Sequence, residues 1–344
     1  MCKTLEPLTG SQRNPVLTDG YGRAVSYLRL SVTDVCNFAC AYCSPDLSAG
    51  CASGQECTAQ ELVRIAGALV RLGIRGVRVT GGEPLLRPDI LDIVRSLRAL
   101  DPRVDLSLTT NGFRLSRLAR GLREAGLGRV NISLDSLDPA AFKRLAGVEG
   151  LAAVREGVAA ALTAGLDPVK LNVVVVQGLN DAEVPAFARL TQDLPLHVRF
   201  IELMPMGQAA QTLGPSRRVP LDAMMALAGP LEAVARPERP NGFGPASVYR
   251  RPGAAGTLGF IAAVSGRFCE TCNRVRVTSR GMLLSCLAAS EGLDLLPLLR
   301  AGATDRALEE AIRVAVAQKP SGHAFGGCSG ARVGAGLGMC GIGG

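Results

Sequence analysis

The segment YLRLSVTDVCNFACAYC, residues 27–43, joins an apolar stretch to three closely spaced cysteines. Its first six residues, 27–32, predict a β-strand. Cys36, Cys40 and Cys43 then form a Cys-x3-Cys-x2-Cys loop, which indicates a metal site. A closed zinc site needs four ligands, so zinc would require one more from elsewhere in the chain. A [4Fe-4S] cluster held by these three thiolates would leave one iron open to an external chelating ligand.

Strand and helix patterns alternate on the C-terminal side of this segment. Further strands are predicted at residues 76–80, 104–109, 129–134, 169–176 and 197–203, and apolar residues repeat at helical spacing over 59–72, 90–100, 115–125, 151–164 and 182–190. This alternation predicts βαβ units and a parallel α/β sheet. Periodicity alone does not separate a partial barrel from an open doubly wound sheet. We favour the barrel, because polar or glycine-rich residues follow several strands at the ends where barrels build active sites.

The regular alternation stops at about residue 205. Glycine and proline interrupt residues 205–259, which predicts a second, less regular domain. The chain finishes with GGCSGARVGAGLGMCGIGG, residues 326–344, which is nearly half glycine. Such a composition disfavours a stable helix or strand, so this tail is either a loose end or a segment that threads beside a ligand.

A TGGEP segment follows the second predicted strand at residues 80–84. Gly81 and Gly82 allow a close approach of the backbone to a ligand, and Pro84 biases Glu83 toward an extended conformation. Alone, such a segment is an ordinary turn. Its position after a strand places it at the same predicted edge as the cysteine loop.

A second cysteine set, Cys269, Cys272 and Cys286, lies in FCETCNRVRVTSRGMLLSC. Zinc or a second iron-sulfur cluster would suit these three thiolates, with Cys328, Cys340 or His323 as a possible fourth ligand. Arg274 and Arg276 follow directly, and residues i and i+2 of an extended segment face the same side. Because guanidinium groups bind phosphate oxygens in a bidentate manner, this pair indicates a site for a phosphorylated substrate.

Composition limits the remaining classes. The 344 residues include 38 Lys plus Arg, 30 Asp plus Glu, 11 Cys and only two His, so a metal site has to rely mainly on thiolates. An odd number of cysteines without a secretory pattern favours metal or redox chemistry in a reducing compartment. No membrane span is expected, and the scattered basic residues do not favour nucleic-acid binding. No Gly-x4-Gly-Lys-Ser/Thr loop is present, so a nucleotide would have to be held by other cations.

Taken together, these motifs resemble the radical S-adenosylmethionine (SAM) superfamily and, within it, the GTP 3′,8-cyclase family of molybdenum cofactor biosynthesis. The resemblance extends over RLSVTDVCNFACAYC, RVTGGEPLLR, LTTNG, VNISLDSL, VKLNVVV, RFIELMPMG, CETCNRVRVTSRG, KPSGHAF and the terminal Gly-Gly. It implies an incomplete (β/α)6 TIM-type barrel with a smaller, less regular C-terminal domain. The implied boundaries are an N-terminal extension at 1–25, the barrel at 26–204, the C-terminal domain at 205–325 and the glycine-rich tail at 326–344.

The resemblance also assigns roles by position. Cys36, Cys40 and Cys43 would hold the SAM-binding [4Fe-4S] cluster, and SAM would contact Tyr42, Gly82, Glu83, Ser133 and Met204. Cys269, Cys272 and Cys286 would hold a second [4Fe-4S] cluster whose open iron takes guanine. GTP would contact Arg29, Arg78, Thr109, Lys170, Arg274, Val275 and Arg276. The catalytic set would be Arg29, Arg274, Arg276, Gly343 and Gly344.

The implied reaction converts GTP to 3′,8-cyclo-7,8-dihydro-GTP. A 5′-deoxyadenosyl radical would remove the 3′ hydrogen of the ribose, and the C3′ radical would attack C8 of guanine. The implied partners are a reductant protein such as flavodoxin or ferredoxin and the downstream cyclic pyranopterin monophosphate synthase. We expect a cytoplasmic monomer or homodimer. Cys2, Cys51, Cys57, Cys328 and Cys340 have no family role and are expected to be reduced, inert thiols.

Two other functions remain as alternatives. A radical SAM peptide-maturation enzyme can also carry an auxiliary cluster, but it would ignore GTP and need a peptide partner. A non-enzymatic zinc or nucleic-acid module would be colourless and stable in air. The Arg-x-Arg pair and the Gly-Gly end favour the cyclase.

Overall fold

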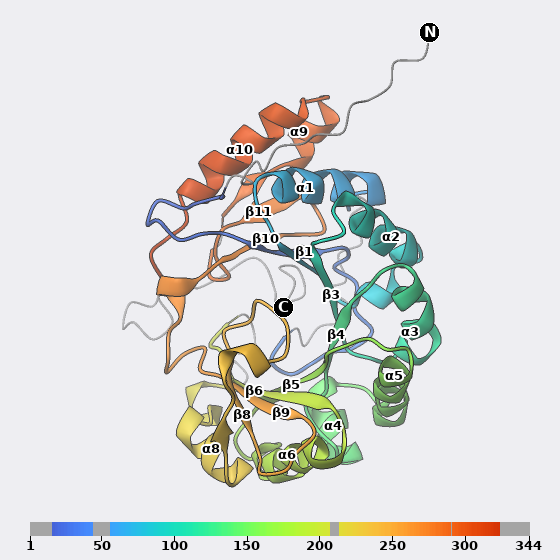
Figure 1. The fold of residues 1–344 in the computed structure, drawn as a ribbon, viewed down its shortest axis with the longest axis vertical. Helices are drawn as coiled ribbons and strands as arrows, with labels where there is room; N and C mark the ends of the chain where they lie inside the picture. The colour runs from blue at the N-terminus through green and yellow to red at the C-terminus, as the bar shows by residue number, and fades with distance from the viewer. Residues whose placement is uncertain (1–15, 44–55, 207–212, 290, 324–344) are drawn as a thin grey trace.

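The computed structural model of the chain describes residues 16–43, 56–206, 213–289 and 291–323. Its centre is a strongly curved sheet with helices on the outer side (Figure 1). The predicted tail residues Gly343 and Gly344, together with Cys2, Cys51, Cys328 and Cys340, lie outside the described residues.

The six predicted strands form consecutive neighbours in this sheet. All five pairings between them are parallel, and the strands are β1 (Tyr27–Ser31), β2 (Gly76–Thr80), β3 (Asp105–Thr110), β4 (Arg129–Ser133), β5 (Val169–Val175) and β6 (Leu196–Glu202). The predicted strand positions are therefore confirmed to within about a residue at each end. The order in space follows the order in the chain, as a barrel requires.

Strands from the C-terminal region extend both edges of this sheet. β9 (Thr257–Ile261) pairs in parallel with β6, and β10 (Arg274–Val277) pairs in parallel with β1. Antiparallel strands lie beyond them: β11 (Met282–Leu284) and β12 (Leu293–Asp294) at one edge, β8 (Ser247–Arg250) and β7 (Glu232–Ala233) at the other. The less regular region thus does not build a sheet of its own, because its strands join the barrel sheet at both ends.

Helices cover the outer face of the curved sheet (Figure 1). They are α1 (Ala59–Arg71), α2 (Ile90–Leu100), α3 (Leu115–Glu124), α4 (Pro139–Ala146), α5 (Leu151–Thr163) and α6 (Val184–Asp193). The C-terminal region adds α8 (Leu221–Ala228), α9 (Leu296–Arg300) and α10 (Asp305–Ala317), and α10 packs against α1. Single turns of 3-10 helix occur at η2 (Pro84–Leu86), η3 (Asp181–Glu183), η4 (Pro215–Arg217), η5 (Arg236–Glu238) and η6 (Cys269–Thr271).

Local capping explains where two of these helices begin. α1 starts with a capping box in which Thr58 Oγ1 accepts from Glu61 N and Glu61 Oε2 accepts from Thr58 N. α4 was not predicted, although Asp138 caps its first turn and Gly147 ends it at φ 72°. The helix is only two turns long, which is too short for a clear apolar period.

Alternation along the strands separates the core from the interior of the barrel. In β1, Leu28 and Leu30 are fully buried against the helices, whereas Tyr27 and Arg29 face the inside. Side chains of a strand point alternately to opposite faces, so every second residue of each strand is available to the interior. The site is therefore built from the inward-facing positions of the parallel strands.

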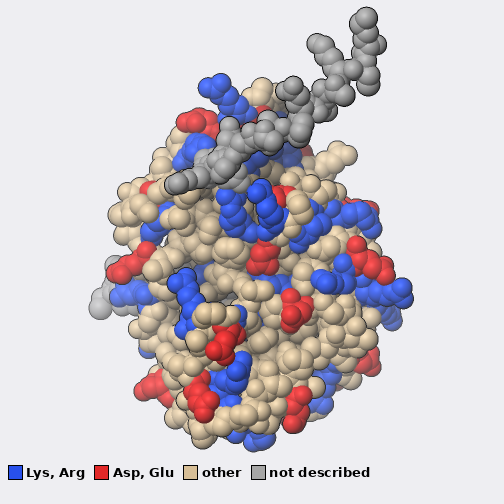
Figure 2. Space-filling view, viewed as in Figure 1, with Lys and Arg blue, Asp and Glu red and all other residues tan. Residues whose placement is uncertain are grey.

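The surface and helices fit the expectations from composition. Lys and Arg are interspersed with Asp and Glu over the face seen in Figure 2. Among the described residues, no helix combines the length and apolar character needed to cross a bilayer.

Candidate active site

A cavity of about 300 Å³ lies inside the curved sheet. Residues of all six barrel strands line it, together with residues of β9, β10 and the segments beside them. The C-terminal strands therefore help to enclose the same cavity that the barrel strands form.

The first cysteine loop forms one wall of this cavity. Cys36, Cys40 and Cys43 all line it. Ala39 N donates to Ala146 O at 3.0 Å and Ala41 N donates to Leu145 O at 2.9 Å, so the end of α4 holds the loop backbone. The loop is thus fixed by the helix that the sequence did not predict.

The glycines of the TGGEP segment allow two loops to pack together. Gly82 N donates to Thr33 O and Glu83 N donates to Val35 O, both at 2.7 Å. A methyl group on Gly82 would lie 2.3 Å from Val35 O, too close for any side chain. Gly81 and Gly82 also line the cavity, so its wall includes the backbone of the TGGEP segment as well as the thiols of the first cysteine loop.

Glu83 is turned away from the cavity wall. Its carboxylate accepts hydrogen bonds from Leu85 N at 3.0 Å, and from Thr110 Oγ1 and Asn111 N at 2.6 Å. Burial raises the pKa of Glu83 to about 7, although these hydrogen bonds oppose the shift. As placed here, Glu83 joins the TGGEP segment to the TTNG turn after β3.

Tyr42 is oriented by an aspartate that the sequence analysis did not single out. Tyr42 Oη donates to Asp135 Oδ2 at 2.6 Å, and Asp135 Oδ1 accepts from Val174 N at 2.8 Å. Both side chains line the cavity next to the first cysteine loop. The hydrogen bond fixes the orientation of the Tyr42 ring in the wall of the cavity.

Arginines from neighbouring strands meet on the inner face. The register places Arg276, Arg29 and Arg78 side by side on β10, β1 and β2, and Tyr27 lies opposite Arg274. All five residues line the cavity. Because these strands are parallel neighbours, the fold itself concentrates positive charge on one wall.

Arg199 adds a further cation from β6 and was missed by the sequence analysis. Its Nη2 donates to Asn131 Oδ1 at 2.7 Å and to Asn172 Oδ1 at 2.6 Å. Burial, together with neighbouring arginines such as Arg78, lowers the pKa of Arg199 to about 9. An arginine in the middle of a largely buried strand, between Val198 and Phe200, was the signal that could have found it.

Several buried polar atoms at this cavity have no hydrogen-bond partner among the described residues. They are Tyr27 Oη, Arg78 Nε, Thr109 Oγ1 and Arg199 Nε, and all four residues line the cavity. A buried polar group without a partner costs about 1–3 kcal/mol, so such groups indicate a bound polar ligand. All four can donate a hydrogen bond, two as hydroxyls and two as guanidinium N–H groups, which fits an anionic ligand.

The second cysteine set borders the cavity through its neighbours. Cys269, Cys272 and Cys286 are half-buried and do not line it, whereas Phe268, Arg274, Arg276 and Leu287 do. Arg274 lies over the Phe268 ring, 4.9 Å from its centroid. Burial opposes ionisation of Cys272, but the charges of Lys319 and Arg274 outweigh it and hold the pKa of that thiol below its usual range. A lowered thiol pKa favours the thiolate form, so the second cysteine set suits a metal group that needs thiolate ligands.

The seven described thiols are not arranged around a single ion. In the part of the chain that the structure describes, no three His, Cys, Asp or Glu side chains converge as one metal ion would require. The seven described cysteines form no disulfide. The first loop offers three thiols beside open cavity space, which fits a cluster larger than one ion with one side left for a ligand.

The remaining predicted contacts divide into two groups. Thr109, Ser133 and Met204 line the cavity. Val275 and Lys170 do not: Val275 faces the core on β10, and Lys170 Nζ donates to the carbonyls of Pro240 and Asn241. Burial and the nearby arginines, such as Arg199, lower the pKa of Lys170 to about 6. Cys57 is fully buried beside Gly281 and away from the cavity, which agrees with the inert role expected for it.

Comparisons with known proteins agree with this architecture. Residues 30–191 match the family model described as Radical SAM superfamily, and residues 196–325 match the one described as Molybdenum Cofactor Synthesis C. GTP 3′,8-cyclase of Geobacter sulfurreducens is 46% identical over 315 residues, which cover 91% of this chain and 95% of that protein. The same enzyme from Pelotomaculum thermopropionicum is 42% identical, with 89% and 95% covered.

Solved structures show the same fold at low sequence identity. Streptococcus suis SuiB bound to S-adenosylmethionine superposes with a TM-score of 0.54 at 14% identity, covering 87% of this chain and 69% of SuiB. SuiB bound to its precursor peptide SuiA gives 0.55 at 15% identity, with 85% and 68% covered. These likenesses concern the fold alone, whereas the sequence relatives match over nearly their whole length. The chain belongs to the GTP 3′,8-cyclase family of radical SAM enzymes.

Proposed function

We propose that this chain cyclises GTP to 3′,8-cyclo-7,8-dihydro-GTP, the first step of molybdenum cofactor biosynthesis. The observation that supports it best is one cavity that joins three thiols on one wall to five arginines, Arg29, Arg78, Arg199, Arg274 and Arg276. Thiols for a SAM-binding cluster and cations for a triphosphate are the two requirements of this reaction.

The two [4Fe-4S] clusters and SAM, when bound, supply the one-electron chemistry that removes the 3′ hydrogen of the ribose. Cys36, Cys40 and Cys43 would hold one cluster, and Cys269, Cys272 and Cys286 the other. Tyr42, Gly82, Ser133 and Met204 would surround SAM. Glu83 would act through the backbone of the TGGEP segment, because its carboxylate is engaged elsewhere.

The arginines would bind the triphosphate and hold the ribose at a fixed distance from SAM. Guanidinium groups offer paired donors to phosphate oxygens. Arg78 Nε, Arg199 Nε and Thr109 Oγ1 are buried and would gain a partner from the nucleotide. Such positioning accounts for much of the rate enhancement of an enzyme whose bond breaking is done by a cofactor.

Other predicted residues would act at the edges of this site. Lys170 would order residues 240–241 beside the cavity rather than bind phosphate directly, and Val275 would support β10 between the two arginines. Gly343 and Gly344 would enter the site as a Gly-Gly end. We keep the domain boundaries of 1–25, 26–204, 205–325 and 326–344 as proposals.

The proposed reaction needs a protein that donates electrons and an enzyme that uses its product. A protein such as flavodoxin or ferredoxin would deliver electrons, and cyclic pyranopterin monophosphate synthase would take the product. Reduced thiols and iron-sulfur clusters suit a reducing compartment, so we place the enzyme in the cytoplasm as a monomer or homodimer.

The test is anaerobic reconstitution with iron and sulfide, followed by incubation with SAM, dithionite and GTP. We expect formation of 5′-deoxyadenosine that depends on GTP, together with a cyclised nucleotide product. GTP-independent formation that instead responds to a peptide would favour the peptide-maturation alternative. Loss of both products in an Arg274→Met variant with intact clusters would support the assigned triphosphate site.

A further inference from the structure

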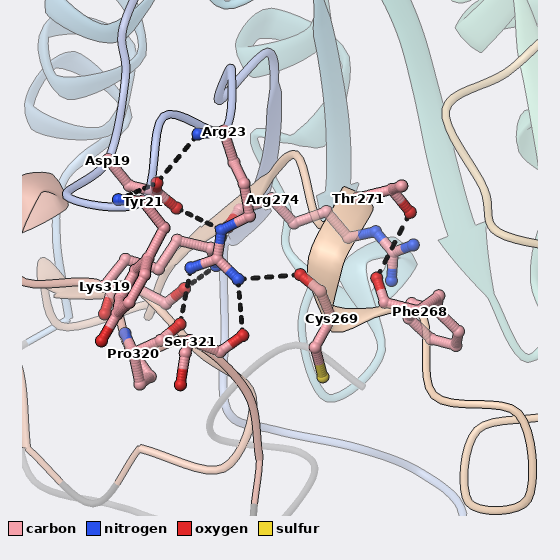
Figure 3. A network of polar contacts seen from close by, with 11 residues as sticks. Asp19, Tyr21, Arg23, Phe268, Cys269, Thr271, Arg274, Lys319, Pro320 and Ser321 are labelled. Carbon is pink, nitrogen blue, oxygen red and sulfur yellow. Dashed lines mark hydrogen bonds and ion pairs between the residues drawn. The ribbon is translucent and has the colours of Figure 1, made fainter.

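The start of the described chain, the second cysteine loop and the end of the described chain meet at one guanidinium (Figure 3). Arg23 Nη1 donates to Cys269 O and to Ser321 O, both at 2.8 Å, and Arg23 Nη2 donates to Pro320 O at 2.6 Å. One largely buried side chain thus binds two segments that lie about 250 and about 300 residues further along the sequence.

Asp19 fixes this guanidinium in place. Its Oδ2 accepts from Arg23 Nε at 2.6 Å, and its Oδ1 accepts from the backbone of Tyr21 and Arg23 at 2.9 and 3.0 Å. The Asp19 side chain is fully buried and that of Arg23 is 9% exposed. The Tyr21 ring lies 5.3 Å from the guanidinium carbon and covers it. Asp19 and Tyr21 therefore set the orientation in which the Arg23 guanidinium binds the cysteine loop.

Lys319 also binds the segments that carry the second cysteine set. Lys319 Nζ donates to Arg274 O at 2.9 Å and to Ser285 O, and the residue is 3% exposed. Ser285 precedes Cys286, and Arg274 begins β10. Arg23 and the buried Lys319 thus bind the carbonyl of Cys269, the carbonyl two residues after Cys272 and the carbonyl that precedes Cys286.

The segment that carries Lys319 also lies beside Cys269. A methyl group added to Gly322 would lie 3.4 Å from Cys269 Cβ and 3.6 Å from its Sγ. Residues 319–322 therefore pack on the second cysteine loop, while Ser26 N and Tyr27 N donate to Asn273 O, each at 3.0 Å, and hold it against β1.

We infer that Asp19, Arg23 and Lys319 form a clamp that sets the position of the second cysteine loop, and hence the geometry of the cluster it holds. None of the three touches the cavity, so they are positioning residues and not catalytic ones. The inference rests on the proposed function in one respect, namely that Cys269, Cys272 and Cys286 bind the second cluster. Through β10 the same clamp fixes where Arg274 and Arg276 enter the cavity.

The chain provides a matched control for Arg23. Arg98 likewise donates to three backbone carbonyls, those of Gly126 at 3.0 Å and of Pro102 and Val104 at 2.9 Å. Neither Arg98 nor its partners line the cavity or belong to a cysteine segment. Arg23→Gln and Arg98→Gln therefore each remove donation to three carbonyls, one set beside the second cysteine set and one away from it, and Arg23→Gln also removes the ion pair with Asp19.

The experiment reconstitutes wild type, Arg23→Gln, Lys319→Met and Arg98→Gln anaerobically, and measures iron per chain and the electron paramagnetic resonance (EPR) spectrum of the reduced protein. Wild type should hold about eight irons in two clusters. We expect Arg23→Gln to fall toward about four, or to keep iron with a changed second-cluster signal, while the first-cluster signal still responds to added SAM. Lys319→Met should change the second signal in the same direction, and Arg98→Gln should match wild type.

The outcomes distinguish failure of the clamp from failure of the assignment of Cys269, Cys272 and Cys286 to a second cluster. If wild type holds about eight irons and Arg23→Gln and Lys319→Met show its iron content and spectrum, the clamp is refuted. If wild type itself holds only about four irons, and a Cys272→Ala variant holds the same, the second cluster and the proposed function fail instead. Arg23→Lys serves where Arg23→Gln does not fold, because one ammonium cannot replace the forked contact and should give an intermediate change.

Discussion

The contact between Gly82 and the first cysteine loop makes a substitution at this residue informative. In Gly82→Ala, the added methyl group would lie 2.3 Å from Val35 O and 2.6 Å from Asp34 O, and backbone atoms cannot rotate away. To lengthen these distances to an ordinary van der Waals contact, the two loops would have to separate by about 1 Å. That separation would stretch the two 2.7 Å hydrogen bonds, Gly82 N to Thr33 O and Glu83 N to Val35 O.

The expected loss of stability follows from these two effects. Overpacking costs about 1–3 kcal/mol, and two hydrogen bonds contribute about 1–3 kcal/mol together. We therefore expect the free energy of unfolding of the iron-free Gly82→Ala chain to fall by about 2–5 kcal/mol in urea titration. Iron binding at the first site should fall as well, because the displaced loop carries Cys36, Cys40 and Cys43.

Gly128→Ala is the control for this experiment. A methyl group there would lie 3.4 Å from Leu106 O, so we expect a change in unfolding free energy within about 1 kcal/mol and full iron content. Gly82→Ala with the stability of wild type and an intact first-cluster EPR signal would refute the packing argument.

Three further predictions concern the cavity. Tyr42→Phe removes the 2.6 Å hydrogen bond to Asp135 and should lower the free energy of unfolding of the iron-free chain by about 1.5–3 kcal/mol in urea; a change below about 0.5 kcal/mol would contradict it. Arg199→Met should raise the KM for GTP by about tenfold or more, with unchanged EPR signals, and an unchanged KM would count against a role in phosphate binding. Because the pKa of Lys170 is lowered from 10.5 to about 6 in the fold, the unfolded chain binds its proton more strongly. Stability should therefore rise as the pH increases from about 6 to 10, and Lys170→Met should flatten that slope in urea titrations at several pH values, whereas an equally steep slope would oppose the assignment.

The sequence was sufficient for the barrel strands and for the first cysteine loop. Strand periodicity, the spacing of Cys36, Cys40 and Cys43, and the Arg-x-Arg pair are local patterns, and each is present in a short stretch of chain. The resemblance to one family then placed Thr109, Ser133 and Met204, which line the cavity.

Other features depend on contacts between distant segments, which one sequence does not reveal. The pairing of β10 with β1 joins residues nearly 250 positions apart, and it brings Arg276 beside Arg29. The two-turn helix α4 had its capping residues in the sequence but too few residues for a visible period. Glu83 and Lys170 remain predicted ligand contacts, and their hydrogen bonds to the turn after β3 and to residues 240–241 join segments that no local pattern connects.

The clamp around Arg23 was also not visible in the sequence. KPSGHAF was noted only as part of the family resemblance, whereas the fold places its first three residues against Arg23 and the second cysteine loop. A buried arginine that binds three carbonyls has no local sequence signature, because the partners lie at both ends of the chain.

The central claim is that both cysteine sets serve one cavity in which GTP reacts. The most direct test uses GTP deuterated at C3′ and measures deuterium in the released 5′-deoxyadenosine for wild type, Cys36→Ala and Cys272→Ala. The account predicts one deuterium transferred by wild type and no cyclised product from either variant. Cyclised product from Cys272→Ala at the wild-type rate, or 5′-deoxyadenosine free of deuterium from wild type, would contradict it.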